Sequence, residues 1–156
     1  MHKASPLPLT LYPDEVLKTP GSKISPRERE EMRELALRMT ETMYHEHGVG
    51  LAAQQIGKAL RICVIDVDGT LHTLINPKIT SFSKDMHTDE EGCLSIPKKF
   101  FPLTRHWKVT VRYEDLDGNT KKLRASGLLA RAVQHELDHL QGIVVLDRYH
   151  EQKGNR

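Results

Sequence analysis

The stretch QHELDHLQGIVV, from Gln134 to Val145, contains two histidines four residues apart, His135 and His139. In a helix this spacing places both imidazoles on one face, with Glu136 about 100° round the axis from His135. The HExxH pattern is typical of a helix that binds a metal ion. The stretch therefore predicts a metal-bearing helix at the centre of the fold.

The helix around this motif is expected to begin after Ser126, a suitable cap, and to end near Gly142, since glycine readily adopts the left-handed conformation at a helix end. Such a helix has two apolar faces. One face carries Leu129, Val133, Leu137 and Leu140, and the other carries Leu128, Ala132, His135 and His139. A helix that is apolar on two faces is expected to be buried within a domain.

A second helix is predicted near the start of the chain. Ser25, Pro26 and Glu28 have the spacing of a capping box with proline at the first helical position, which opens a helix over residues 26–44. The apolar residues of this segment fall on one stripe, and the remainder is largely charged. The stripe consists of Met32, Leu35, Ala36, Met39 and Met43. This pattern predicts an amphipathic helix packed on the core.

Between the two helices the sequence favours strands. The β-branched run RICVIDV over residues 61–67 is followed by an Asp-Gly turn at 68–69 and by LHTLINP, which predicts a β-hairpin. A second hairpin is predicted over residues 107–125, with Asp-Gly at its turn. Because hairpins pair antiparallel strands, the expected fold class is α+β, with antiparallel β-sheets packed around a central HExxH-bearing helix and an N-terminal amphipathic helix.

The composition is that of one globular domain spanning residues 1–156, with 38% hydrophobic and 28% charged residues. The formal net charge of +2 is small, so neither a nucleic acid nor a membrane surface is expected as a partner. No stretch approaches the roughly 20 apolar residues of a membrane span. Two cysteines do not suggest a disulfide framework, and the expected location is the reducing cytoplasm, with an organellar or viral origin left open.

Two histidines do not complete a metal site, so a third protein ligand is required. A third histidine, as in the pattern HExxHxxGxxH, is absent because Val145 occupies that position, and the only glutamate after His139 is Glu151, close to the end of the chain. The ligand is therefore expected upstream. Cys93 in the stretch EEGCLSIP is the best candidate, because a thiolate is a strong soft ligand; a buried structural cysteine is the alternative. Cys63, within an apolar strand, is expected to be a core thiol.

Three protein ligands leave one position open, which is typical of a catalytic site. The metal would lower the pKa of a water molecule there, while Glu136 is placed to take the proton of that water and return it to a leaving amine. The developing negative charge needs neutral donors, for which the backbone N–H of Leu94 and the side-chain amide of an Asn or Gln are suited. The predicted reaction is hydrolysis of an amide.

Three stretches together resemble the signatures of the peptide deformylases, enzymes that remove the formyl group from N-formylmethionine at the start of bacterial and organellar proteins. GVGLAAQQ at 48–55 is similar to the family motif GxGLAAxQ, EGCLS at 91–95 to the second motif, and QHELDHLQG at 134–142 to the third. HExxH alone is shared by many metalloproteases, whereas three motifs in this order are specific. The similarity in pattern covers nearly the whole chain.

The resemblance implies a role for each matching residue. The metal ligands would be Cys93, His135 and His139. Glu136 would be the general acid and base, while the side-chain amide of Gln55 and the N–H of Leu94 would stabilise the formyl oxygen. The cofactor would be one divalent metal ion, iron(II) by family precedent, with zinc, nickel or cobalt as alternatives because such a ligand set accepts several metals.

The resemblance also implies that the substrate peptide adds as a strand beside Val49, Gly50 and Gly92, where the glycines permit close approach. The methionine side chain is expected in an apolar pocket next to His135. The candidates for the lining of this pocket are Val49, Leu128 and Ala132. Ordinary core packing is the alternative for these three side chains.

Two features outside the motifs carry further expectations. Arg131 and Asp138 are predicted to form a solvated surface pair, with the alternative that Arg105 pairs with Glu91 or Asp138 behind the metal ligands.

Many family members continue past the third motif with a further C-terminal helix, used by some to approach the ribosome, whereas this chain ends in the polar stretch DRYHEQKGNR. The expected partners are N-formylmethionyl nascent polypeptides, met by a monomer, and transient ribosome contact is left open.

Two other functions are also left open. A metallopeptidase would cut internal bonds of unformylated peptides, and the three motifs argue against it. A non-catalytic metal-binding homologue would need neither Gln55 nor Glu136, and both are present.

Overall fold

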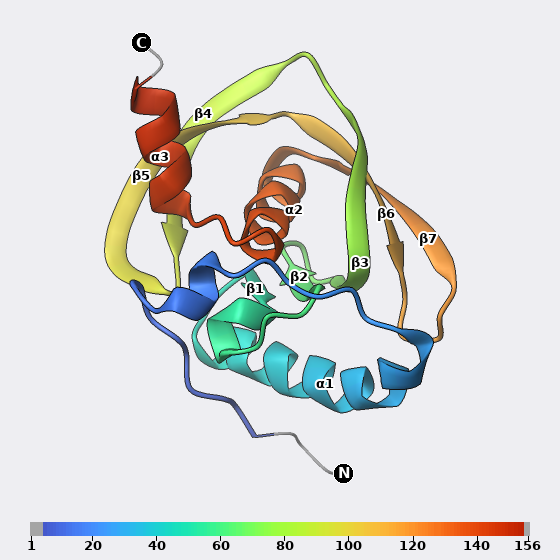
Figure 1. The fold of residues 1–156 in the computed structure, drawn as a ribbon. Coiled ribbons are helices and arrows are strands. Elements are labelled where there is room, and N and C mark those ends of the chain that lie inside the picture. Colours follow the sequence, from blue (N-terminus) through green and yellow to red (C-terminus); the bar gives the residue numbers. More distant parts are fainter. Residues whose placement is uncertain (1–4, 155–156) are drawn as a thin grey trace.

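Helix α2 (Gly127–Leu140) runs through the middle of the molecule, and β-strands curve around it, in the computed structural model, which describes residues 5–154 (Figure 1). The other helical elements are η1 (Glu15–Lys18), η2 (Pro26–Glu28), α1 (Arg29–His45), η3 (Ala53–Ile56) and α3 (Val145–Gly154). The strands are β1 (Gly50–Ala52), β2 (Ile62–Asp66), β3 (Leu71–Phe82), β4 (Met86–Cys93), β5 (Ile96–His106), β6 (Lys108–Glu114) and β7 (Thr120–Ser126). Within residues 5–154 no helix has the length and apolar character to cross a membrane.

The larger sheet has five strands in the order β1-β2-β3-β6-β7, and every neighbouring pair is antiparallel. Both predicted hairpins lie in it: β2 turns into β3 through Gly69, and β6 turns into β7 through Gly118, each glycine with a positive φ. Strands β4 and β5 form a second, two-stranded antiparallel sheet. The prediction of antiparallel sheets is confirmed, and β1 lies at one edge of the larger sheet.

The first long helix is preceded by the predicted capping box. The backbone N–H of Ser25 donates to Oε1 of Glu28 at 3.0 Å. Residues 26–28 form the tighter turn η2, so the α-helix itself begins at Arg29, later than predicted, and ends at His45. The five apolar residues of its predicted stripe are all buried.

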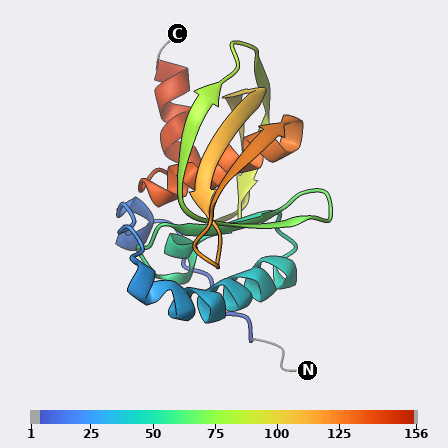
Figure 2. The same ribbon diagram turned by 90° about the vertical axis from the view of Figure 1, so that its right-hand side faces the viewer.

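Strand β2 shows how the larger sheet is covered on both faces. Cys63 and Ile65 belong to the core cluster shared with α2, whereas Ile62 and Val64 belong to the cluster shared with α1. This alternation follows from the two-residue period of a strand. Helix α1 accordingly lies along one side of the sheet, well away from α3 (Figure 2).

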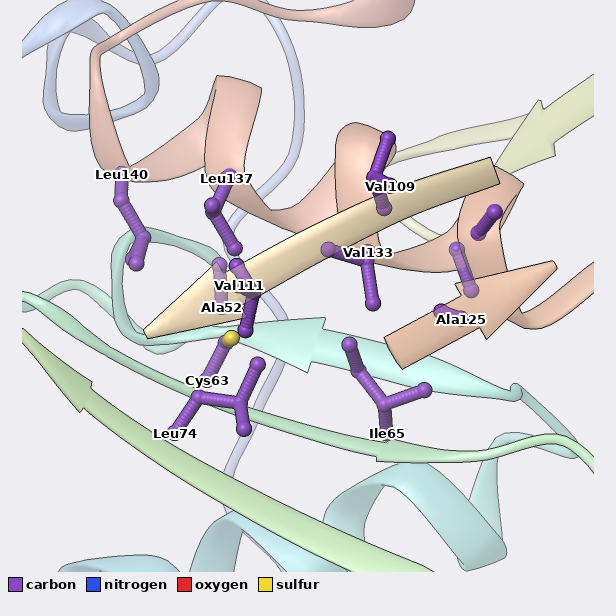
Figure 3. Close-up of a cluster of buried hydrophobic side chains, with 12 residues drawn as sticks. Ala52, Cys63, Ile65, Leu74, Val109, Val111, Ala125, Val133, Leu137 and Leu140 are labelled. Carbon is purple, nitrogen blue, oxygen red and sulfur yellow. The ribbon is translucent and has the colours of Figure 1, made fainter. Parts of the chain in front are cut away.

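The core between the larger sheet and α2 is built from one face of that helix. Val133, Leu137 and Leu140 pack there with residues of the strands (Figure 3). Burial of each such side chain contributes on the order of 1.5–3 kcal/mol. Cys63 lies fully buried in the same cluster with a free thiol, so the prediction of a core thiol is confirmed, and burial raises the pKa of this thiol.

Residues Val145–Gly154 form helix α3, so the expectation that the chain ends in a polar stretch without a further helix is wrong. Leu146 and Tyr149 pack against buried Leu103 of β5 and its neighbours. The side chain of Gln152 also accepts from the N–H of Thr104 and donates to its carbonyl oxygen, both at 2.9 Å. The helix depends on these contacts with β5, which a mostly polar sequence does not reveal.

Gly142 ends α2 as predicted, with a φ of +78°, and it lies against the N-terminal segment of the chain. A Cβ at this position would stand 2.5 Å from the carbonyl oxygen of Lys18. Gly69 has a similar φ of +92°, but a Cβ there would meet nothing within 4 Å. We expect Gly69→Ala to lower the free energy of unfolding by about 1–2 kcal/mol, the cost of the left-handed conformation, and Gly142→Ala to lower it by more.

Urea denaturation of the two variants and the unaltered protein measures this difference. Because both positions carry the same conformational cost, any excess for Gly142→Ala reports the collision with Lys18. Equal losses for the two variants would contradict the close packing of this segment.

Candidate active site and metal centre

Three potential metal ligands, one from β4 and two from α2, lie close together. Cys93 ends β4, and His135 and His139 lie one turn apart on α2. Their ligand atoms all lie within 4.8 Å of one another, with Cys93 Sγ 3.4 Å from Nε2 of His139. One sulfur and two imidazole nitrogens suit a divalent transition metal and leave a fourth position open. The three side chains therefore fit a metal of the catalytic kind.

The turn after β4 places Cys93 in this position. The pairing of β4 with β5 shifts register between Gly92 and Cys93, and β5 resumes at Ile96 after a tight turn. A Cβ on Gly92 would stand 2.7 Å from the ring of Phe100. A larger residue at position 92 would therefore have to displace the ring of Phe100, which is 66% exposed.

The two imidazoles are held differently. Nδ1 of His135 lies 2.9 Å from Oε1 of Glu91, which leaves Nε2 on the side of Cys93. His139 is fully buried, and burial, together with the charge of nearby His135, holds the pKa of His139 well below its usual value. Burial, the larger of these two causes, favours the neutral imidazole that a metal ligand requires.

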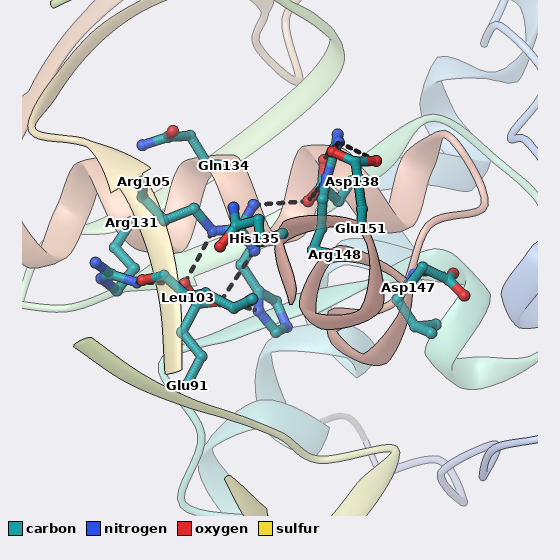
Figure 4. Close-up of polar contacts among 12 residues, drawn as sticks. Glu91, Leu103, Arg105, Arg131, Gln134, His135, Asp138, Asp147, Arg148 and Glu151 are labelled. Carbon is teal, nitrogen blue, oxygen red and sulfur yellow. Dashed lines mark hydrogen bonds and ion pairs between the residues drawn. The ribbon is translucent and has the colours of Figure 1, made fainter. Parts of the chain in front are cut away.

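Glu91 is the centre of a buried ion network (Figure 4). Its carboxylate accepts from Nε and Nη2 of Arg105 at 2.8 and 3.0 Å and from Nη1 of Arg131 at 2.6 Å. Burial alone would favour the neutral acid, but the hydrogen bonds from His135 and Arg105 outweigh it and hold the pKa of Glu91 well below its usual range. Glu91 is thus a buried, charged acceptor for His135.

The prediction of a solvated surface pair between Arg131 and Asp138 is wrong. Arg131 is only 9% exposed and pairs with Glu91, because the β4–β5 sheet covers this side of α2. Asp138 instead pairs with Arg105 at 2.7 Å and with Arg148 of α3 at 2.9 Å. The alternative expectation, that Arg105 pairs with Glu91 or Asp138, is confirmed for both acids.

Glu136 is buried beside the three ligands and faces β1. A Cβ on Gly50 would collide with Oε2 of Glu136, so the approach of this carboxyl group to the strand requires glycine. Oε1 of Glu136 has no hydrogen-bond partner among the described residues. Burial raises the pKa of Glu136 to about 7, which suits a group that both accepts and donates a proton near neutral pH.

Gln55 supplies a neutral amide at the same place. Its Oε1 accepts from the N–H of Ala52 at 2.9 Å, which directs Nε2 toward the site. There Nε2 lies 3.7 Å from Sγ of Cys93 and 3.2 Å from Oγ of Ser95. Ser95 is also buried, and it is the last residue of EGCLS, the motif that contains Cys93, so the motif could have identified it.

A cavity of about 500 Å³ opens onto these groups. Its lining includes the predicted site residues Val49, Gly50, Gln55, Gly92, Cys93, Leu94, Leu128, Ala132, His135 and Glu136. Val49 is 44% exposed and Leu128 58% exposed, so these two side chains line the cavity and are not core. Ala132 is buried in the core cluster and also borders the cavity.

Comparison with known proteins agrees with this arrangement. Residues 6–155 match the family described as polypeptide deformylase. The peptide deformylase of Dictyoglomus thermophilum is 49% identical over 135 residues, which cover 86% of this chain and 87% of the relative. The chain belongs to the peptide deformylase family. Members of this family are metallohydrolases that remove the N-formyl group from nascent peptides.

Solved peptide deformylase structures share the fold. The crystal structure of the enzyme from Thermotoga maritima has a TM-score of 0.88 at 36% identity and covers 92% of this chain and 97% of its own. A peptide deformylase from Synechococcus elongatus in complex with actinonin has a TM-score of 0.88 at 38% identity and covers 99% of this chain and 91% of its own. The mixed fold with antiparallel sheets is therefore that of the family.

The network around Glu91 generates a prediction about stability. Glu91→Gln removes a buried charge that two arginines face, and breaking a buried pair in this way costs about 3–5 kcal/mol. Glu90, its exposed neighbour on β4, provides the matched control, and Glu90→Gln is expected to change the free energy of unfolding by less than about 0.5 kcal/mol. Urea denaturation measures both, and similar values for the two variants would show that the network contributes little.

Proposed function

We propose that this chain hydrolyses the formyl amide of N-formylmethionyl peptides at a divalent metal ion held by Cys93, His135 and His139, with residues 1–156 acting as one catalytic domain. The observation that carries the proposal is that these three donors lie within 4.8 Å of one another, beside a cavity that Cys93, His135, Glu136 and Gln55 line. A purely structural metal site needs neither a buried carboxyl group nor an amide donor beside it.

The metal is proposed to be iron(II), with zinc, nickel or cobalt able to occupy the same ligands. When bound there, such an ion would polarise the formyl carbonyl and lower the pKa of the attacking water. Glu91 supports the proposed ligand set, because its acceptance of a hydrogen bond at Nδ1 of His135 keeps Nε2 free for the metal.

Glu136 is proposed as the general acid and base. It takes the proton of the attacking water as the carbon–oxygen bond forms, and it gives a proton to the amine as the carbon–nitrogen bond breaks. Its buried position supports this cycle in two ways: a pKa of about 7 makes both proton transfers accessible, and Oε1 has no other partner among the described residues.

The formyl oxygen gains negative charge during the attack and is proposed to be stabilised by Gln55 and Leu94. The bond from Ala52 to Oε1 of Gln55 fixes the amide so that its N–H groups face the cavity. Leu94 follows Cys93 in the turn and contributes its backbone N–H. Neutral donors of this kind stabilise an oxyanion without competing for the metal.

The substrate peptide is proposed to pair with the exposed edge strand. Because β1 is the first strand of the five-stranded sheet, its outer side is available to another strand beside Val49 and Gly50, and Gly92 also lines the cavity there. The methionine side chain is proposed to enter the apolar part of the cavity. That part is lined by Val49, Leu128 and Ala132.

The proposed setting is the cytoplasm, where a monomer acts on formylated nascent chains. The polar end of the sequence leaves ribosome contact open, and helix α3, which follows the third motif, supports such contact. We therefore include transient contact with the ribosome in the proposal.

The experiment that tests the function is formate release from a formyl-Met tripeptide by protein loaded with iron(II) under anaerobic conditions, with the unformylated tripeptide as control. We expect formate from the first peptide and no cleavage of either at internal bonds. Internal cleavage would favour a metallopeptidase, and no reaction from metal-replete protein would favour a non-catalytic homologue.

Glu136→Ala separates catalysis from metal binding. The variant is expected to retain one equivalent of metal, because Glu136 is not among the proposed ligands, and to lose formate release by about 100-fold or more. Glu46→Ala, at an exposed acid on the rim of the same cavity, is the control and should keep normal turnover. Near-normal turnover by Glu136→Ala would remove Glu136 from the mechanism.

A further inference from the structure

Arg131 differs from the other arginines of the buried network because it also donates to backbone carbonyl oxygens of the second sheet. From α2, its Nη1 donates to Oε2 of Glu91 at 2.6 Å and to the carbonyl oxygen of Leu103 at 3.0 Å, and its Nη2 donates to the carbonyl oxygen of His87 at 2.8 Å. Glu91 and His87 lie on β4, and Leu103 lies on β5. A single side chain of the helix is therefore bonded to both strands of the second sheet.

These contacts lie directly behind the proposed metal ligands. Arg131 precedes His135 by one helical turn, so both side chains project from the same side of α2. Glu91 precedes Cys93 by two residues at the end of β4, and both side chains are buried. The hydrogen bond between Arg131 and Glu91 thus joins α2 to β4 close to the proposed ligand on each element.

Charge neutralisation does not account for Arg131. Arg105 already contacts both oxygens of Glu91, so this carboxylate has a cationic partner without Arg131. Burying an additional guanidinium group is costly unless its donors are satisfied in a defined geometry. The three hydrogen bonds of Arg131 can form together only at the observed separation between α2 and the β4–β5 sheet.

We infer that Arg131 is a positioning residue for the metal centre: it fixes the helix that carries His135 and His139 against the strand that carries Cys93. The inference rests on the proposed function, because it assumes that these three residues share a metal. Arg131 lies outside the proposed ligand set, although it borders the cavity, and it acts on that set through Glu91 and the strand carbonyls. Its role is to set the distance between the two halves of the ligand set.

The test uses cobalt(II), whose visible absorption reports ligand geometry and whose sulfur charge-transfer band reports the bond to Cys93. The unaltered protein, Arg131→Met and Arg131→Lys are stripped of metal and titrated with cobalt(II). Val111→Ala, a cavity variant in the core between the sheet and α2, controls for loss of stability alone, since Val111 lies outside the ion network.

We expect Arg131→Met to bind cobalt(II) at least tenfold more weakly, with altered absorption bands and a reduced kcat for formate release. Arg131→Lys should give an intermediate affinity, because one ammonium group can reach Glu91 but cannot bond all three acceptors at once. Val111→Ala should keep the unaltered spectrum and affinity although it unfolds more readily. If Arg131→Met does not fold, Arg131→Lys provides the same comparison.

Cobalt spectra and affinities for the Arg131 variants equal to those of the unaltered protein would overturn the inference, even if both variants are less stable. A different result would overturn the proposed function instead: unaltered protein that binds cobalt(II) without a sulfur charge-transfer band would show that Cys93 is not a ligand. The two failures are therefore distinguishable.

Discussion

The buried carboxylate of Glu91 joins the two parts of the molecule that carry the proposed metal ligands. It lies on β4, close to Cys93, and it accepts hydrogen bonds from Arg131 and His135 of α2 and from Arg105 of β5. A charge in the protein interior is tolerated only when it is paired and hydrogen-bonded. Satisfying this one group fixes α2 against the second sheet, and the arrangement of the site follows from it.

One side of α2 packs in the hydrophobic core, and the other side carries the residues of the proposed site. One side supplies Val133, Leu137 and Leu140 to the core under the larger sheet, and the stability of the fold comes largely from such burial. The other side can then carry groups that are unfavourable on their own, such as the buried carboxyl group of Glu136, one oxygen of which has no partner among the described residues. Natural proteins accept such local costs at functional sites.

Local sequence patterns predict those features of the fold that are determined by residues close together in the sequence. The Asp-Gly turns, the stripe of α1 and the burial of Cys63 are of this kind, and the three motifs bring together the residues that line the cavity. The burial of Arg131 cannot be predicted in this way, because its partner Glu91 lies 40 residues away and an arginine on a helix ordinarily faces water. Helix α3 is likewise hidden, since its contacts are with β5.

The position of β1 has a consequence for timing. This strand has three residues and lies at the edge of its sheet. A peptide that pairs with this strand has to be fully extended and pairs over about the same length. The remainder of the substrate therefore makes no contact with the strand. On the proposed binding mode, a polypeptide whose first residues have already joined a helix or a core cannot be processed. Deformylation then has to precede the folding of the substrate's own N-terminus.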